Sequence, residues 1–242
     1  MKKEKNITIL TWIGCVIISI AMIYVVLISA CEFAIYSDMD IYQEEYEKYG
    51  VLENLDMEMD DVMYVTEEMM LFLYSKRADL VIDTVVGGEP REFFNESEIS
   101  HMEDVRVLFA QGVFTRTVCI IMIIVLLLFI MKCNKRRWKE ILSKAYIRTS
   151  IMLAVVVGII GALFVIDFNK YFTIFHHIFF VGDTWIFDPR ESLMINMLPE
   201  GLFYDMALRI VVVFFVFMFI TLLVACVARI LEKKKKINTT YK

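Results

Sequence analysis

Four long apolar runs constrain the fold of this chain more than any other feature of its sequence. They cover residues 7–37, 113–131, 149–166 and 210–228. A helix rises about 1.5 Å per residue, so about 20 apolar residues cross a hydrocarbon core about 30 Å thick. Because that core holds no water to satisfy backbone groups, each run must be helical. With 59% hydrophobic residues in a chain of 242, the sequence predicts an all-α integral membrane protein with four transmembrane helices.

Basic residues outside these runs predict how the helices are oriented. Lysine and arginine gather in residues 1–6, in residues 132–148 and in residues 229–242. Short cytoplasmic segments beside membrane helices are enriched in these residues, so all three segments are expected inside, together with both termini. Residues 38–112 and 167–209 are then left on the extracellular side, where they would form a cap and a second loop.

The first outer segment, residues 38–112, is strongly acidic and contributes most of the formal net charge of −5. A solvated, mainly helical cap is therefore expected, and not a surface for nucleic acid. From Asp56 to Tyr74 apolar residues, many of them methionine, recur at helical spacing. Packing within the cap is favoured for this face over contact with lipid tails. The β-branched run Leu80–Val86, which two glycines end, is either a short strand or an extended segment.

A further helix is expected at the end of this cap. Ser100 and Glu103 have the spacing of a capping box, which predicts a helix start with His101 in the first turn. The helix is expected to run to about Ala110 and to bend at Gln111-Gly112, so that it could lie on the membrane surface.

The second outer segment, residues 167–209, is rich in aromatic residues and is expected at the membrane interface. Its aromatic group comprises Tyr171, Phe172, Phe175, Phe179, Phe180, Trp185 and Phe187. Asp188 followed by Pro189 is a typical helix start, with Asp188 as N-cap. A short helix is therefore expected to begin there and to end near Leu198.

All three histidines of the chain fall in these outer segments, at positions 101, 176 and 177. The unperturbed pKa of histidine, about 6.5, suits proton transfer at neutral pH. At a helix N-terminus, His101 would be kept neutral by the helix dipole. His176 and His177 would point about 100° apart on a helix, so only one of them can face a shared site. The alternative is that each histidine simply bonds to lipid headgroups at an aromatic belt.

Other chemistries lack their sequence patterns. The chain has no His-Glu-x-x-His pair, no Gly-x-Ser-x-Gly elbow, no glycine-rich phosphate loop and no acidic residue in the middle of a span. Neither a metal nor a cofactor is therefore expected. The five cysteines lie in or beside the spans and are expected as free thiols, although Cys31 and Cys119 could form one bridge. Ile28–Cys31 fits a lipoprotein signal pattern, but the preceding run exceeds the about 7–15 apolar residues of such a signal, so an uncleaved helix is expected.

Several short motifs resemble the lipoprotein intramolecular transacylase family of low-GC Gram-positive bacteria. They are Phe175-His176-x-Ile-Phe-Phe, Gly182-Asp-Thr-Trp185, Phe187-Asp-Pro, Leu198-Pro-Glu-Gly-Leu-Phe203 and Ser100-His101-Met102-x-Asp104-Val105. The layout of four spans with both termini inside is similar too. The resemblance covers nearly the whole chain, although the acidic residues 38–68 carry no matching motif.

The resemblance implies a function and a site. Members of the family move the sn-2 acyl chain of a lipoprotein's S-diacylglyceryl group to the amino group of its N-terminal cysteine, which leaves a lyso form. It implies that His101 and His176 are catalytic and that His177 occupies a variable position. Which of the two is the base is left open. The expected partners are a diacylglyceryl-modified lipoprotein and membrane lipid in a bacterial cell membrane, with no nucleic acid; the oligomeric state is left open.

An aromatic pocket is expected to confine the substrate beside these histidines. Its predicted substrate-binding residues are Phe179, Phe180, Trp185, Phe203 and Arg106. Arg106 and Trp185 are also the candidates for stabilising an oxyanion. Two other functions stay open from the sequence: a membrane sensor or scaffold without catalysis, and a lipid hydrolase that uses the same histidines with water.

Overall fold

The computed structural model of the protein describes residues 2–134, 137–182 and 184–240. Lys135 and Arg136, which belong to the predicted basic loop, and Asp183, which belongs to one of the quoted motifs, lie outside the described residues. The chain divides into two compact units. The membrane unit comprises Met1–Cys31, Phe114–Gly161 and Val211–Lys242, and the cap unit comprises Glu32–Val113 and Ala162–Ile210.

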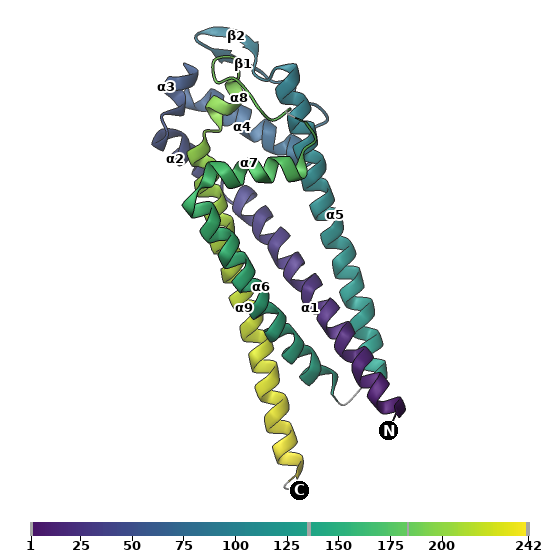
Figure 1. Cartoon of the computed structure of the whole chain (residues 1–242). Coiled ribbons are helices and arrows are strands. Elements are labelled where there is room, and N and C mark those ends of the chain that lie inside the picture. Colours follow the sequence, from purple (N-terminus) through teal and green to yellow (C-terminus); the bar gives the residue numbers. More distant parts are fainter. Residues whose placement is uncertain (1, 135–136, 183, 241–242) are drawn as a thin grey trace. The chain divides into compact units, whose positions relative to one another are not determined.

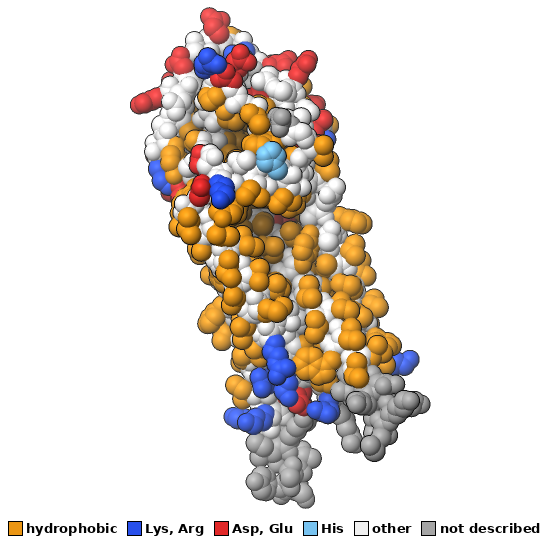
Figure 2. Space-filling view, in the orientation of Figure 1, with side chains coloured by type: hydrophobic (Ala, Val, Ile, Leu, Met, Phe, Trp, Pro, Cys, Tyr) orange, Lys and Arg blue, Asp and Glu red, His pale blue; other side chains and the backbone are white. Residues whose placement is uncertain are grey.

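Four helices are long and apolar enough to cross a membrane, as the sequence predicted. They are α1 (Lys2–Tyr36), α5 (Glu96–Cys133), α6 (Trp138–Ile166) and α9 (Glu200–Thr240), as labelled in Figure 1. Hydrophobic side chains cover the face of the membrane unit that Figure 2 shows, while acidic side chains gather on the cap unit. The described part of the chain is thus a helical multi-pass membrane protein.

Two clusters of buried hydrophobic side chains hold the membrane unit together. Residues of α1, α5 and α6 form one of them, and residues of α1, α6 and α9 form the other. Gly14 permits a close approach between helices, because a Cβ there would lie 2.9 Å from Cδ1 of Ile130. The Tyr146 hydroxyl donates to Thr221 Oγ1 (2.6 Å), which joins α6 to α9. All five cysteines are free thiols, as expected.

The cap unit is mainly helical, with one small hairpin. Its further elements are α2 (Asp40–Lys48), α3 (Val51–Leu55), α4 (Met59–Leu73), β1 (Asp83–Val86), β2 (Glu89–Glu92), α7 (Phe168–Phe179) and α8 (Leu193–Met197). The strands are antiparallel, with Val86 opposite Glu89. Gly87 and Gly88 both have positive φ (61° and 80°), as a tight two-residue hairpin turn requires. The β-branched run before these glycines is therefore partly a strand.

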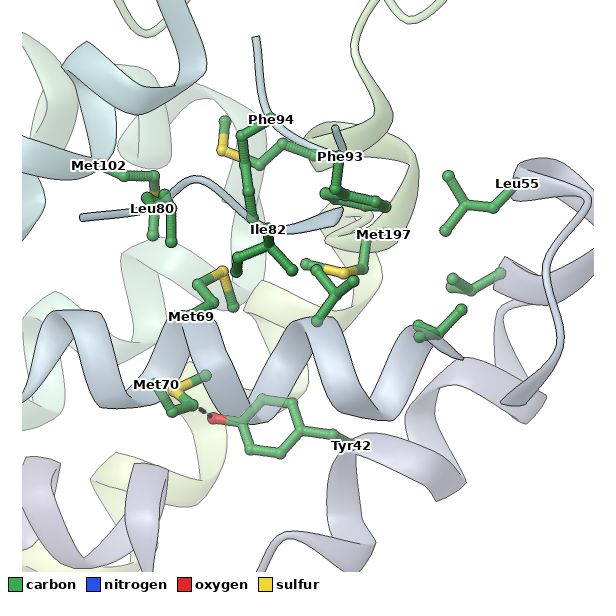
Figure 3. Packing of buried hydrophobic residues seen from close by; sticks show 14 of the residues in the cluster. Tyr42, Leu55, Met69, Met70, Leu80, Ile82, Phe93, Phe94, Met102 and Met197 are labelled. Carbon is green, nitrogen blue, oxygen red and sulfur yellow. Dashed lines mark hydrogen bonds between the residues drawn. The ribbon is translucent and has the colours of Figure 1, made fainter. Parts of the chain in front are cut away.

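The core of the cap unit forms around one face of α4. Figure 3 shows Met69 on this helix directed toward Ile82, Phe93 and Met197, which come from three other parts of the chain. These four side chains are at most 1% exposed. The methionine-rich face of α4 thus packs within the cap, in agreement with the interpretation favoured from the sequence.

Helix α5 begins five residues earlier than predicted. It starts at Glu96, because the capping box is formed by Asn95 and Glu98. The Glu98 amide donates to Asn95 Oδ1 (3.0 Å), and the Asn95 amide donates to Glu98 Oε2 (2.7 Å). The predicted start at Ser100 is therefore wrong, and His101 lies in the second turn of the helix.

The predicted end of this helix near Ala110 is also wrong, because α5 continues as one helix to Cys133. A glycine in a helix costs about 1 kcal/mol relative to alanine. A helix of 38 residues tolerates this cost without a break.

The short helix of the second outer segment begins later than predicted. Asp188 does not cap it, because its carboxylate accepts from the Arg190 amide (2.9 Å) and from the Arg190 guanidinium. Helix α8 begins at Leu193 instead, and its N-cap is Ser192, whose Oγ accepts from the Ile195 amide (3.3 Å).

Candidate active site

Two of the three histidines lie together in the cap unit. His101 extends from α5 and His176 from α7, and their ring centroids are 6.1 Å apart with planes inclined by 29°. Both side chains are buried, at 7% and 8% exposure. The neighbouring His177 is exposed, because adjacent residues on α7 point about 100° apart. The structure therefore brings together the two histidines that were predicted as a pair.

His176 is held by its own helix. Its Nδ1 lies 2.8 Å from the carbonyl oxygen of Phe172, one turn earlier. Since a carbonyl oxygen only accepts, Nδ1 carries the proton, and in the neutral ring Nε2 is the free acceptor. Burial lowers the pKa of His176, and the nearby charge of His177 lowers it further, while the bond to Phe172 opposes both. His176 is thus prepared to receive a proton at Nε2.

His101 lies in the cap part of α5, ahead of the membrane-spanning part that begins at Phe114. Its pKa is lowered to about 4, mainly by burial and also by charge repulsion from His176, while Asp104 acts in the opposite direction. A neutral ring at physiological pH follows. Within residues 2–134, 137–182 and 184–240, the buried Nδ1 of His101 has no hydrogen-bond partner. A buried polar atom of this kind requires an explanation.

Aromatic rings enclose the two histidines. The rings of Phe180 and Phe187 meet His101 edge to face, with centroids 5.0 Å and 5.7 Å away. The ring centroid of Trp185 lies 4.7 Å from that of His176 and 5.3 Å from that of His177. The buried Nε1 of Trp185 likewise has no partner among the residues that the structure describes. One unpartnered indole donor and one unpartnered imidazole nitrogen therefore belong to the same aromatic site.

The other predicted substrate-binding residues differ in their distance from this site. Phe180 contacts both histidines. Phe203 reaches the site only through Phe172, at 5.3 Å between ring centroids. Phe179 is half exposed, and its ring lies 4.7 Å from that of Phe175.

Arg106 is engaged elsewhere in the cap unit. Its guanidinium lies 4.2 Å from the centroid of the Phe72 ring, and it donates to the carbonyl oxygen of Ala78 (3.1 Å). Both contacts belong to the packing of the cap, so of the two candidate oxyanion donors Trp185 is the one that adjoins the histidines.

Two site residues were not predicted from the sequence as substrate-binding. The ring centroid of Phe172 lies 4.2 Å from that of His176, and the carbonyl oxygen of Phe172 accepts the hydrogen bond from His176 Nδ1. Its spacing of four residues from His176 on a helix was an available signal. Phe187 contacts His101 from a loop, and no local pattern in the sequence indicates this contact. The described part of the chain contains no group of three or more histidine, cysteine, aspartate or glutamate residues that could hold a metal ion.

Comparisons with known proteins identify the family of the chain and relate its fold to solved structures. The model of a family described as lipoprotein intramolecular transacylase Lit matches residues 16–203. A solved structure of the membrane integral lipoprotein intramolecular transacylase Lit from Bacillus cereus has a similar fold. It has a TM-score of 0.72 and 19% sequence identity, with 94% of this chain and 98% of that chain covered. A histidine-to-arginine variant of the Bacillus cereus protein gives a TM-score of 0.71 at 18% identity, with 98% of each chain covered. No curated protein sequence matches the chain.

Proposed function

Because the chain belongs to the lipoprotein intramolecular transacylase family, we propose that His101 and His176 are the proton-transfer pair of its acyl transfer. The substrate is a lipoprotein whose N-terminal cysteine carries an S-diacylglyceryl group and a free amine. The reaction moves the sn-2 acyl chain from the glyceryl oxygen to that amine. A lyso-form lipoprotein with one acyl chain on nitrogen results.

The observation that carries this proposal is the buried, stacked histidine pair with an unpartnered nitrogen. Burial lowers the pKa of both rings, and repulsion from His176 lowers that of His101 further, which favours the neutral forms that can accept a proton. A purely structural pair in such a position would be expected to have its buried nitrogens bonded.

The proposed reaction needs two proton transfers. As the amine nitrogen attacks the ester carbonyl and forms the new N–C bond, an imidazole removes one proton from it. The tetrahedral intermediate then breaks its bond to the sn-2 oxygen, and an imidazolium returns a proton to that oxygen. His176 can exchange its proton with the substrate only at Nε2, because Nδ1 is bonded to Phe172. Neither a metal nor a covalent acyl-enzyme is required.

The aromatic enclosure supplies orientation in this proposal. Donor and acceptor belong to one molecule, so the site mainly has to hold the head of the substrate in a ring-like conformer. Correct orientation can lower a barrier by about 7–11 kcal/mol. We assign the indole N–H of Trp185 as the donor to the carbonyl oxygen that becomes negative, since Nε1 is buried without a partner among the described residues and the ring adjoins His176.

We also propose that the site lies at the extracellular membrane interface. Helix α7, which carries His176, begins after a single residue that follows the spanning helix α6. On one face Ile174 and Ile178 are 42% and 69% exposed, while Lys170 and His177 lie exposed on a neighbouring face. Apolar and basic faces side by side are typical of a helix in the plane of the interface, where membrane lipid would cover the isoleucines.

The proposed topology predicts a labelling pattern. In a cysteine-free background, Glu89→Cys in the hairpin should react with a membrane-impermeant maleimide on intact cells, because residues 38–112 lie outside. Restoring only the native Cys133, which is exposed and follows the second span, provides the matched control and should react only after lysis. Reaction of both sites from the same side would contradict the topology.

The function itself is tested by fragment-ion mass spectrometry of a tryptic N-terminal lipopeptide, from cells with and without the gene. Transfer leaves the total mass unchanged and places one acyl chain on the amine. Loss of an acyl chain would show a hydrolase instead. An unchanged lipopeptide would favour a sensor or scaffold.

A further inference from the structure

One carboxylate of the cap unit is fully buried and lies outside the proposed proton-transfer pair. Glu98 is 0% exposed. Its Oε1 accepts from Ser192 Oγ (2.5 Å) and from the Met194 amide (3.0 Å), and its Oε2 accepts from the Asn95 amide (2.7 Å). An ionised carboxylate only accepts hydrogen bonds, so these donors fit it well. The partners Ser192 and Met194 lie more than ninety positions away along the chain.

These bonds connect Glu98 to the loop that covers His101. Ser192 donates its amide to the carbonyl oxygen of Asp188 (3.0 Å), which closes a tight turn. Phe187 immediately precedes this turn, and its ring meets His101 at 5.7 Å. His101 in turn lies three residues after Glu98 on the same face of α5. Glu98 is therefore connected to His101 in two ways: directly along α5, and through the turn and the ring of Phe187.

We propose that Glu98 is a positioning residue for the acyl transfer, which holds Phe187 against His101 through the turn at Asp188–Ser192. This inference rests on the proposed function, because it assigns Glu98 a role toward one of its two histidines. Glu98 touches neither substrate nor the reacting atoms. Its role is to keep the aromatic enclosure closed over His101, and so to keep water away from this ring.

The geometry explains why a carboxylate is needed at this position. Each oxygen of Glu98 faces at least one N–H or O–H donor. A glutamine of the same shape would place its NH₂ group against one of these donors, whichever way the amide turned. At least one hydrogen bond of this side chain would therefore be lost, and a buried donor would be left unsatisfied.

The test compares Glu98→Gln, Ser192→Ala, Phe187→Ala and the double variant Glu98→Gln/Phe187→Ala as purified full-length proteins. The substrate is a synthetic diacylglyceryl lipopeptide, and rates are normalised to folded protein. Each single change is expected to lower kcat by up to about 10²-fold, as small misplacements do. The double variant should be no slower than the slower single variant, because both changes remove the same support of His101, which runs from Glu98 through the turn to Phe187. Glu96→Gln, an exposed neighbour in the same helical turn, is the matched control and should keep wild-type activity.

The pH profile separates positioning from simple loss of stability. The proposed cycle starts with both rings neutral, so protonation of His101 contributes to the acid limb of kcat/KM whichever histidine is the base. If Glu98→Gln admits water to His101, the pKa of this ring rises from about 4 toward its unperturbed value, and the acid limb moves to higher pH. Removing a negative charge without any movement would shift the limb the opposite way.

An acid limb that does not rise in either Glu98→Gln or Ser192→Ala would overturn the inference, as would additive losses in the double variant. His101→Ala is measured in parallel. Full activity of that variant would refute the proposed function, whereas loss in His101→Ala with normal Glu98→Gln would refute only the role of Glu98.

Discussion

Alanine in place of His101 or of His176 is expected to abolish acyl transfer, while His177→Ala should keep most of it. General acid and base groups typically contribute about 10²–10⁴-fold to a rate, and His101 and His176 form the buried pair. His177 is exposed and meets only the edge of Trp185 among the aromatic rings described around it. The assay follows the acyl chain from the glyceryl group to the amine by fragment-ion mass spectrometry.

The two damaging substitutions should also be non-additive, because both histidines serve one cycle of proton transfer. His177→Ala is a close control, since it removes the same ring from the next residue of the same helix. A dead His177→Ala beside an active His176→Ala would contradict the assignment of faces on α7. Activity in all three single variants would remove histidine chemistry from this protein.

Trp185→Phe is expected to lower the rate by about 10²–10³-fold, the usual effect of losing one oxyanion donor. Phenylalanine keeps an aromatic ring beside His176 but lacks the indole N–H, whose nitrogen is buried without a described partner. Trp185→Ala should lose at least as much activity while the protein remains folded and inserted, because its role is at the site. Rates are compared per amount of folded protein.

Trp138→Phe, in the membrane unit, is the matched control and should behave as wild type. If Trp185→Phe is fully active and Trp185→Ala is not, the ring confines the substrate and the N–H has no role. Parallel loss of folded protein and activity in Trp185→Ala would instead make this residue an interfacial anchor.

The features of this fold that depend on period and length could be predicted from the sequence. The spans follow from the number of consecutive apolar residues that a bilayer requires. That only one of His176 and His177 pairs with His101 agrees with the angle between adjacent residues on a helix, whereas the choice of His176 came from the resemblance. Both arguments depend only on the spacing of residues within one helix, and this spacing can be counted in the sequence.

Features decided by contacts between distant segments could not be predicted in this way. Two capping boxes, Asn95 with Glu98 and Ser100 with Glu103, have the same spacing. The first prevails in the structure, where Glu98 is also bonded to Ser192 from the second outer segment. Contact of Phe187 with His101 is likewise tertiary. Local patterns describe what a segment can form, and partners elsewhere in the chain select among those options.

The composition of the cap core has a consequence for the order in which the protein can be built. A ribosome delivers the N-terminal half first, so residues 32–113 emerge well before residues 162–210. Yet Met194, Met197 and Leu202 complete the core formed by α4 and the hairpin region. During synthesis the apolar face of α4 therefore stays incompletely covered until the third span and the residues after it have been made. The histidine pair is likewise divided between the two halves, so a nascent chain has no assembled site until His176, Trp185 and Phe187 have been translated.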